Sequence, residues 1–141
     1  MFFQKIGPDY LVRLEVGDEL VTSLAALCRQ ESILLASVSG LGATNDCDIS
    51  VYDVQEQRYY KNSFQGAYEI TGLAGNVTRM DDEPYLHLHI TLGDREGRAF
   101  AGHLNRAIIS ATAEIFLHTY PVEITRSRDE SSGLNLLDLD E

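Results

Sequence analysis

The chain has 141 residues, of which 44% are hydrophobic, and its 22 acidic and 11 basic side chains give a formal net charge of −11. The length and apolar content suit a single domain with one core, and the negative charge repels phosphate backbones, which argues against general nucleic-acid binding. Because the sequence contains no basic leader and no apolar run near the ~20 residues that cross a bilayer, we expect a cytoplasmic protein with no membrane partner.

The first expected elements in chain order are a short strand at residues 10–14 and a helix at residues 19–30. The helix is predicted from apolar residues that recur at i, i+4, i+7 and i+8, namely Leu20, Leu24, Leu27 and Cys28. Such a stripe should pack one face of the helix against a sheet.

A buried strand is expected next, at residues 33–39, because the segment is almost entirely apolar or small. We interpret the following glycine pair, Gly40 and Gly42, as a turn that ends this strand. The pair lacks the Lys-Ser/Thr and the helix of a phosphate-binding loop, so a nucleotide site is not indicated.

The remainder of the domain has the aromatic and β-branched composition of strands with short connections. We expect strands at residues 46–53, 57–64, 66–77, 85–92, 98–103 and 108–118, the last of which is Ala-rich and could also be helical. Short connections favour antiparallel pairing. The fold class is therefore predicted to be α+β, a mainly antiparallel β-sheet backed by a helix.

One helix can cover only one face of such a sheet. The other apolar face needs a second surface, and a cyclic homo-oligomer would supply it. We expect residues 1–125 to form the domain and residues 126–141 to form a tail. The tail carries four leucines, which favour docking on the domain or on a neighbouring subunit.

Three of the four histidines fall in one short region. His87 and His89 alternate with apolar residues, which places both imidazoles on one face of a half-buried strand with Cα atoms about 6.6 Å apart. Turn residues at 93–97 predict a hairpin that returns His103 beside them. Three neutral imidazoles with one open tetrahedral position are the ligand set of a catalytic zinc. The alternative is that these histidines are ordinary solvated or carbonyl-bonded side chains.

Glu114 is the acidic residue that we consider with this cluster, because a carboxylate inside the apolar run 108–117 needs a partner. It could be a fourth ligand, an acceptor for a ligating imidazole, or a general base acting on bound water. Asp94 is the other candidate for moving a proton.

Several segments occur in an order that is typical of one known family. They include SVSGLGA at 37–43, residues 68–76, LHLHITLGD at 86–94, residues 97–98, GHL at 102–104, ATAE at 111–114 and GLNLLD at 133–138. Together they resemble the plants-and-prokaryotes-conserved (PPC) domain in its bacterial and archaeal single-domain form, over nearly the whole chain. The resemblance implies a helix-backed antiparallel sheet assembled into a homotrimer. It also implies a metal site at His87, His89 and His103, for which zinc is the best guess, with iron, nickel and cobalt compatible.

Plant members of this family carry the domain beside AT-hooks, and prokaryotic relatives share the DNA-binding label by association. This chain has no such Arg-Gly-Arg-Pro segment. DNA binding would require four arginines to converge on one face, namely Arg79, Arg95, Arg98 and Arg106, and the charge of the chain disfavours it.

Two other functions are compatible with the sequence. The first is a trimeric metal-binding module for assembly, regulation or interaction with a protein partner, and it requires the fewest assumptions about the sequence. The second is a small metal-dependent hydrolase-like enzyme in which Glu114 moves the proton. No Ser-His-Asp or Cys-His nucleophile pattern is visible, so we lean toward the module and leave hydrolytic chemistry as the alternative.

Overall fold

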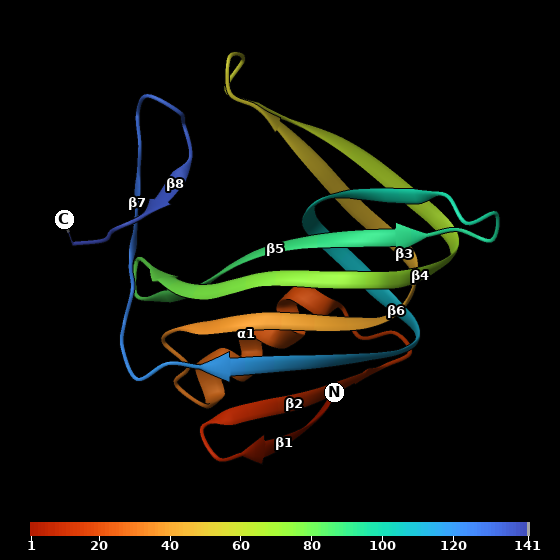
Figure 1. The fold of residues 1–141 in the computed structure, drawn as a ribbon, viewed down its shortest axis with the longest axis horizontal. Coiled ribbons are helices and arrows are strands. Elements are labelled where there is room, and N and C mark those ends of the chain that lie inside the picture. The colour runs from red at the N-terminus through yellow and green to blue at the C-terminus, as the bar shows by residue number, and fades with distance from the viewer. Residues whose placement is uncertain (141) are drawn as a thin grey trace.

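A computed structural model describes residues 1–140 and shows one bent antiparallel sheet with a single helix on one face (Figure 1). The elements are β1 (Phe2–Ile6), β2 (Asp9–Glu15), α1 (Leu20–Gln30), β3 (Ala36–Asp53), β4 (Arg58–Met80), β5 (Glu83–Gly93), β6 (Ala99–Thr119), β7 (Arg126–Arg128) and β8 (Asn135–Leu137). The six-stranded sheet has the order β1-β2-β6-β3-β4-β5, and β7 and β8 form a separate hairpin. The predicted antiparallel α+β class is confirmed.

Strand β6 also pairs with β5, so β3, β4, β5 and β6 form a closed circuit. This closure is possible because β3, β4 and β6 are 18, 23 and 21 residues long and change register along their length. One half of β6 therefore pairs with β5, and the other half pairs with β2. Strand β6 thus has different pairing partners at its two ends.

Helix α1 has the boundaries and the buried face that the sequence predicts. Glu19 caps its N-terminus, with side-chain oxygens that accept from the backbone N–H groups of Val21 and Thr22. The four residues of the predicted stripe are completely buried. No helix within residues 1–140 is both long enough and apolar enough to cross a membrane.

The face of the sheet away from α1 keeps apolar side chains in contact with solvent. Leu41 on β3 is 56% exposed and Phe116 on β6 is 54% exposed, whereas their neighbour Ile115 is fully buried on the inner side. The alternation of a half-buried strand explains this pattern. The described chain therefore leaves this outer face uncovered.

The expected turn at Gly40 and Gly42 is wrong, because β3 continues through both residues. A Cβ atom on Gly42 would lie 2.5 Å from the carbonyl oxygen of Thr112, and one on Gly40 would lie 2.8 Å from that of Glu114. The two glycines allow β3 to approach β6 closely where the register changes. Likewise, the strands expected at 57–64 and 66–77 are one strand, β4, and those at 98–103 and 108–118 are one strand, β6.

The C-terminal hairpin of β7 and β8 lies at the left of Figure 1, beside the ends of β4 and β5. It is attached to its own domain by backbone and side-chain hydrogen bonds. The N–H of Arg79 donates to the carbonyl of Ile124 at 2.9 Å, and the hydroxyl of Tyr52 donates to the carbonyl of Ser132 at 2.7 Å. The hairpin consequently forms a wall next to the histidine-bearing strands.

Candidate metal centre

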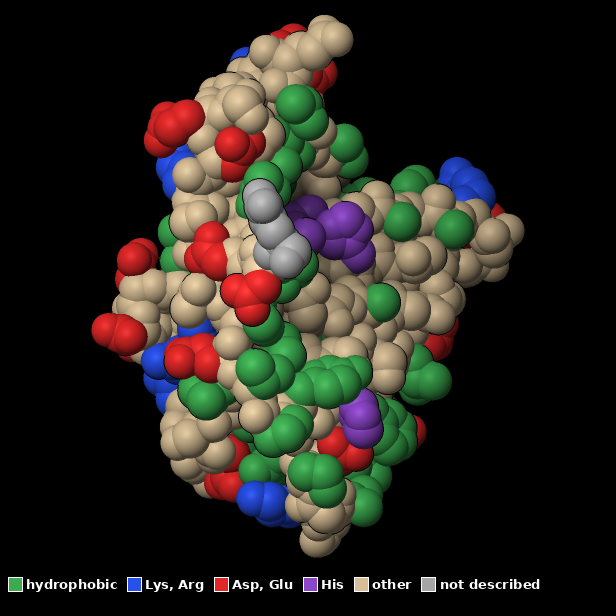
Figure 2. All heavy atoms as spheres, turned by 60° about the vertical axis from the view of Figure 1, so that its left-hand side comes forward, with side chains coloured by type: hydrophobic (Ala, Val, Ile, Leu, Met, Phe, Trp, Pro, Cys, Tyr) green, Lys and Arg blue, Asp and Glu red, His purple; other side chains and the backbone are tan. Residues whose placement is uncertain are grey.

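The structure brings His87, His89 and His103 together. Each offers one ring nitrogen, and these three nitrogens lie within 4.8 Å of one another. The ring centroids of the three imidazoles are 5.2 to 5.7 Å apart. Figure 2 shows histidine side chains gathered at a hollowed part of the surface, with another histidine apart from them. We call His87, His89 and His103 the histidine triad.

Local sequence explains why the triad forms. Leu88 and Ile90 are each 1% exposed and point into the core. Because side chains alternate along a strand, His87 and His89 point to the opposite face. The register pairs His89 directly with His103 across β5 and β6, which confirms the predicted hairpin. The three histidines therefore come from two adjacent strands joined by one short turn.

Gly102 controls how closely β6 approaches β3 at this site. A Cβ atom there would lie 2.5 Å from Cγ2 of Ile49 and 2.8 Å from the carbonyl oxygen of Ser50. Real Cβ atoms do not come this close to other atoms, so a glycine is needed immediately before His103.

The environment of two triad members, His87 and His103, favours the neutral imidazole, which is the form that binds metals. Burial lowers the pKa of His87 to about 4, and the charges of His103, Arg126 and His89 add to this effect. Burial, followed by the charge of His89, also lowers the pKa of His103. At neutral pH these two imidazoles each keep a lone pair available for coordination.

The triad lines one side of a pocket of about 500 Å³. Tyr59 stands beside it, with its ring centroid 5.5 Å from that of His103 and 4.7 Å from that of Tyr52. Leu134 and Leu136 of the C-terminal hairpin region contribute an aliphatic wall. Among residues 1–140, no carboxylate side chain lines this pocket.

Arg126 also lines the pocket, and sequence reasoning missed it. Its side chain donates from Nε to the Thr78 hydroxyl, from Nη1 to the Asn135 carbonyl and from Nη2 to Oδ1 of Asn76, at 2.7 to 2.9 Å. The guanidinium stacks 4.9 Å from the ring centroid of Tyr85. The signal in the sequence was slight, a basic residue at the start of an acidic tail.

Glu114 and Asp94 are not brought to the triad. Glu114 is exposed and pairs in register with Arg13 and Leu41, on the half of β6 that leaves the pocket. Asp94 lies in the turn between β5 and β6, where its carboxylate accepts from Arg98 at 2.7 Å. Neither residue is placed to act as a fourth ligand or as a base on metal-bound water.

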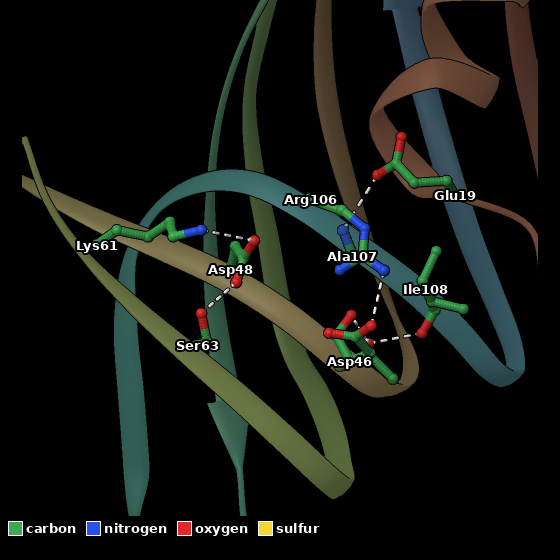
Figure 3. A network of polar contacts seen from close by, with 9 residues as sticks. Glu19, Asp46, Asp48, Lys61, Ser63, Arg106, Ala107 and Ile108 are labelled. Atoms are coloured by element: carbon green, nitrogen blue, oxygen red, sulfur yellow. Dashed lines mark hydrogen bonds and ion pairs between the residues drawn. The ribbon is translucent and has the colours of Figure 1, made fainter.

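Most of the arginines considered for DNA binding contact acidic residues. Arg106 contacts Asp46 at 2.7 Å within a network that also contains Glu19 and Asp48 (Figure 3). Arg98 pairs with Asp94 and Glu96, and Arg79 pairs with Glu123. Three of the four arginines named in the sequence analysis are thus partly neutralised by neighbouring carboxylates.

Comparison with known proteins places the chain among proteins of one fold. The family model of the Plants and Prokaryotes Conserved (PCC) domain matches residues 1–121. A crystal structure from Bacteroides thetaiotaomicron, provisionally labelled a DNA-binding protein, is 34% identical with a TM-score of 0.94 and covers 97% of this chain and 96% of that chain. The plant- and prokaryote-conserved protein of Pyrococcus horikoshii is 33% identical with a TM-score of 0.88, covering 99% and 96%.

A further crystal structure, of a protein from Archaeoglobus fulgidus described as metal-containing, is 31% identical with a TM-score of 0.85 and covers 96% of this chain and 97% of that chain. Among curated proteins, the chain is 28% identical over 127 residues to a protein of Synechococcus named bifunctional protein GlmU. The chain spans only 19% of the length of that relative, although the match includes 88% of this chain.

Proposed function

This chain belongs to the Plants and Prokaryotes Conserved domain family, and we propose that it is a metal-binding module in which His87, His89 and His103 are the ligands. The observation that carries the proposal is the convergence of three imidazole nitrogens within 4.8 Å on two adjacent strands. Three imidazoles held on two paired strands fit the donor set of a transition metal. The metal-containing Archaeoglobus relative supports the same assignment.

Zinc is the metal that three imidazoles favour, and ligand type alone leaves iron, nickel and cobalt compatible. When bound, the metal would supply a Lewis-acidic coordination position. The chain's own residues hold and orient the ligands. Buried Leu88 and Ile90 fix the direction of the β5 histidines, and the Tyr59 ring packs against His103.

The role that best fits this module is assembly, regulation or recognition of a protein partner, as a homotrimer. The uncovered outer face of the sheet supports self-association, because exposed Leu41 and Phe116 would gain burial against another copy. Light scattering should give the mass of three chains for the wild type, and Phe116→Glu should reduce it. Val16→Glu is the control, because Val16 is also an exposed apolar residue, at 71%, and lies outside the strands of the sheet. A wild-type mass of one chain would contradict the homotrimer.

A metal-dependent hydrolase-like enzyme is the second candidate, and the pocket of about 500 Å³ beside the triad favours it. The described residues provide no carboxylate there, and Glu114 lies elsewhere on β6. Because the three imidazoles would be occupied by the metal, a proton would have to be moved by another polar group of the pocket, such as the Tyr59 hydroxyl. Hydrolytic activity therefore ranks below a binding role.

DNA binding ranks last. The Bacteroides relative carries that label, but this chain has a net charge of −11, and three of the four arginines considered, Arg79, Arg98 and Arg106, pair with acidic neighbours. Retention of a DNA duplex that falls steeply with added salt would reverse this ranking.

Elemental mass spectrometry of the full-length, untagged protein tests the metal-binding proposal. We expect about one transition metal per chain, as for a single three-imidazole site, and loss of the metal in His89→Ala. His118→Ala is the matched control, because His118 contacts Asp9 at 2.8 Å and lies outside the triad. Wild-type protein that neither carries a metal nor takes one up on reconstitution would refute the proposal, as would full metal content in His89→Ala.

A further inference from the structure

We propose that the pocket beside the triad binds a small organic carboxylate, with the charged end held by Arg126 and the apolar body packed against tyrosines and leucines. The inference rests on the proposed metal site for part of its chemistry, since Arg126 and the triad share one pocket. It names the class of ligand that the module recognises.

The first argument is the unbalanced charge of Arg126. Its side chain is 9% exposed, yet it forms no ion pair with any acidic residue in the described range 1–140. Charged groups this deeply buried are normally paired, because removal from water is costly. The three acceptors of Arg126 are neutral, namely a hydroxyl, a backbone carbonyl and an amide oxygen.

The second argument is the number of donors that remain. A guanidinium carries five N–H groups, and the structure accounts for one on Nε, one on Nη1 and one on Nη2. One N–H on each terminal nitrogen therefore has no hydrogen-bond partner among residues 1–140. Two donors in a fixed plane match the two oxygens of a carboxylate.

The third argument is the charge of the pocket as a whole. Arg126 lines the same pocket as His87, His89 and His103. A divalent metal on the histidines would add further positive charge to the same pocket. With no carboxylate from residues 1–140 lining it, the pocket has a potential that favours an anion.

The fourth argument concerns the rest of the ligand. A volume of about 500 Å³ is larger than an inorganic anion needs and falls in the range of small-molecule pockets. Tyr52 and Tyr59 offer aromatic rings, and Leu134 and Leu136 offer an aliphatic surface opposite the strands. These walls favour a carboxylate with an aromatic or branched apolar body over free phosphate.

The pocket is lined by residues from two separate segments of the chain. The triad lies inside the segment that matches the family, residues 1–121, whereas Arg126, Leu134 and Leu136 follow it. The Tyr52 hydroxyl donates to the Ser132 carbonyl, and the Asn135 side chain donates to the Tyr85 hydroxyl on β5, so both bonds attach the hairpin to the sheet. Within the hairpin, Arg126 donates to the Asn135 carbonyl. The family domain thus supplies the metal side of the pocket, and the C-terminal hairpin supplies the anion side.

Benzoate is a suitable probe, with neutral benzamide as its isostere and inorganic phosphate as the bare anion. Isothermal calorimetry on the protein, with and without Co²⁺, measures the binding of each probe directly. The visible spectrum of Co²⁺ reports whether the triad has taken up the ion and whether its coordination changes. We expect benzoate to bind with a Kd of about 1 mM or tighter, and more tightly when Co²⁺ is present. Benzamide and phosphate should bind at least tenfold more weakly.

Arg126→Met should weaken benzoate binding at least tenfold, which corresponds to about 1.4 kcal/mol. Arg128→Met is the matched control, because Arg128 lies two residues along the same strand and is exposed. Arg126→Lys keeps the charge and should retain part of the affinity, which a purely structural role in the hairpin would not explain. If Arg126→Met does not fold, the comparison of benzoate with benzamide on the wild type decides the question.

The outcomes separate this proposal from the metal site. A cobalt spectrum without benzoate binding up to about 10 mM, which is weaker than the specific range, overturns the anion site and leaves the metal site standing. Benzoate binding that depends on Arg126 in protein that takes up no Co²⁺ supports the anion site and refutes the metal site. Equal binding of benzoate and benzamide, or unchanged binding in Arg126→Met, overturns the proposal.

Discussion

Substitution of Gly102 by alanine should disrupt the triad without touching any histidine. The added Cβ would lie 2.5 Å from Cγ2 of Ile49, and ordinary van der Waals contact begins at 3.4 Å. The difference, 3.4 − 2.5 = 0.9 Å, is the displacement that β6 or β3 must absorb. Neither obstacle yields easily, because Ile49 is 2% exposed in the core and the second contact is the backbone oxygen of Ser50. Overpacking of this kind costs about 1–3 kcal/mol of stability.

The displacement acts on the proposed metal site because His103 is the next residue. Metal–ligand distances tolerate deviations of about 0.2 Å, so a shift several times larger should weaken binding of Co²⁺ by roughly 10- to 100-fold, as loss of a supporting contact does. Urea unfolding of the metal-free protein measures the first effect, and cobalt titration against a competing chelator measures the second.

Gly72→Ala on β4 is the matched control, since no atom lies within 4 Å of its added Cβ. It should leave metal affinity unchanged and alter stability by at most about 1 kcal/mol. If Gly102→Ala matches the wild type in both measurements, the close packing of β6 on β3 does not position His103, and the reasoning fails.

Three further substitutions test the core, the role of Glu114 and the triad's protonation. Leu24→Ala, at a completely buried position of α1, should cost about 2–5 kcal/mol in urea unfolding; a loss below 1 kcal/mol would argue against the observed packing. Glu114→Gln should leave metal content unchanged by mass spectrometry, because Glu114 is exposed and pairs in register with Arg13 and Leu41. Since the folded-state pKa of His87 is about 4, against 6.5 for a free imidazole, the unfolded chain binds more protons between these values. Stability of the metal-free protein should therefore fall by about 1–3 kcal/mol as the pH drops from 6.5 to 4. His87→Gln should flatten this dependence in urea titrations, and an unchanged slope would contradict the assigned pKa.

The triad could be predicted from the sequence because its geometry is local. Alternation fixes the shared face of His87 and His89, and a short turn fixes the return of His103. Helix α1 was predictable for the same reason, since its buried stripe and its cap lie within twelve residues from Glu19 to Gln30. Neither feature depends on contacts between distant parts of the chain.

Predictions failed where contacts are distant in sequence. Gly40 and Gly42 were interpreted as turn residues, but a glycine that lets two strands approach has the same local pattern as one that reverses the chain. Glu114 and His103 are on one strand, yet β6 changes partners from β5 to β2 between them. Only the pairing of whole strands reveals that change.

The pocket combines a part that is local in sequence, the histidine triad, with a part that depends on distant contacts, around Arg126. The histidine side is built from one hairpin and should form whenever β5 and β6 pair. The arginine side depends on a tail that returns about fifty residues later to Asn76 and Thr78 on β4. Loop-closure entropy opposes contacts of long sequence separation, and a segment near a terminus that is mostly exposed, as β8 is, opens more readily than buried strands. A bound anion would thus stabilise the packing of the tail in particular. The reason is that the anion would neutralise the buried guanidinium of Arg126, which belongs to the hairpin. A carboxylate ligand should consequently order the C-terminal hairpin while leaving the triad's own geometry unchanged.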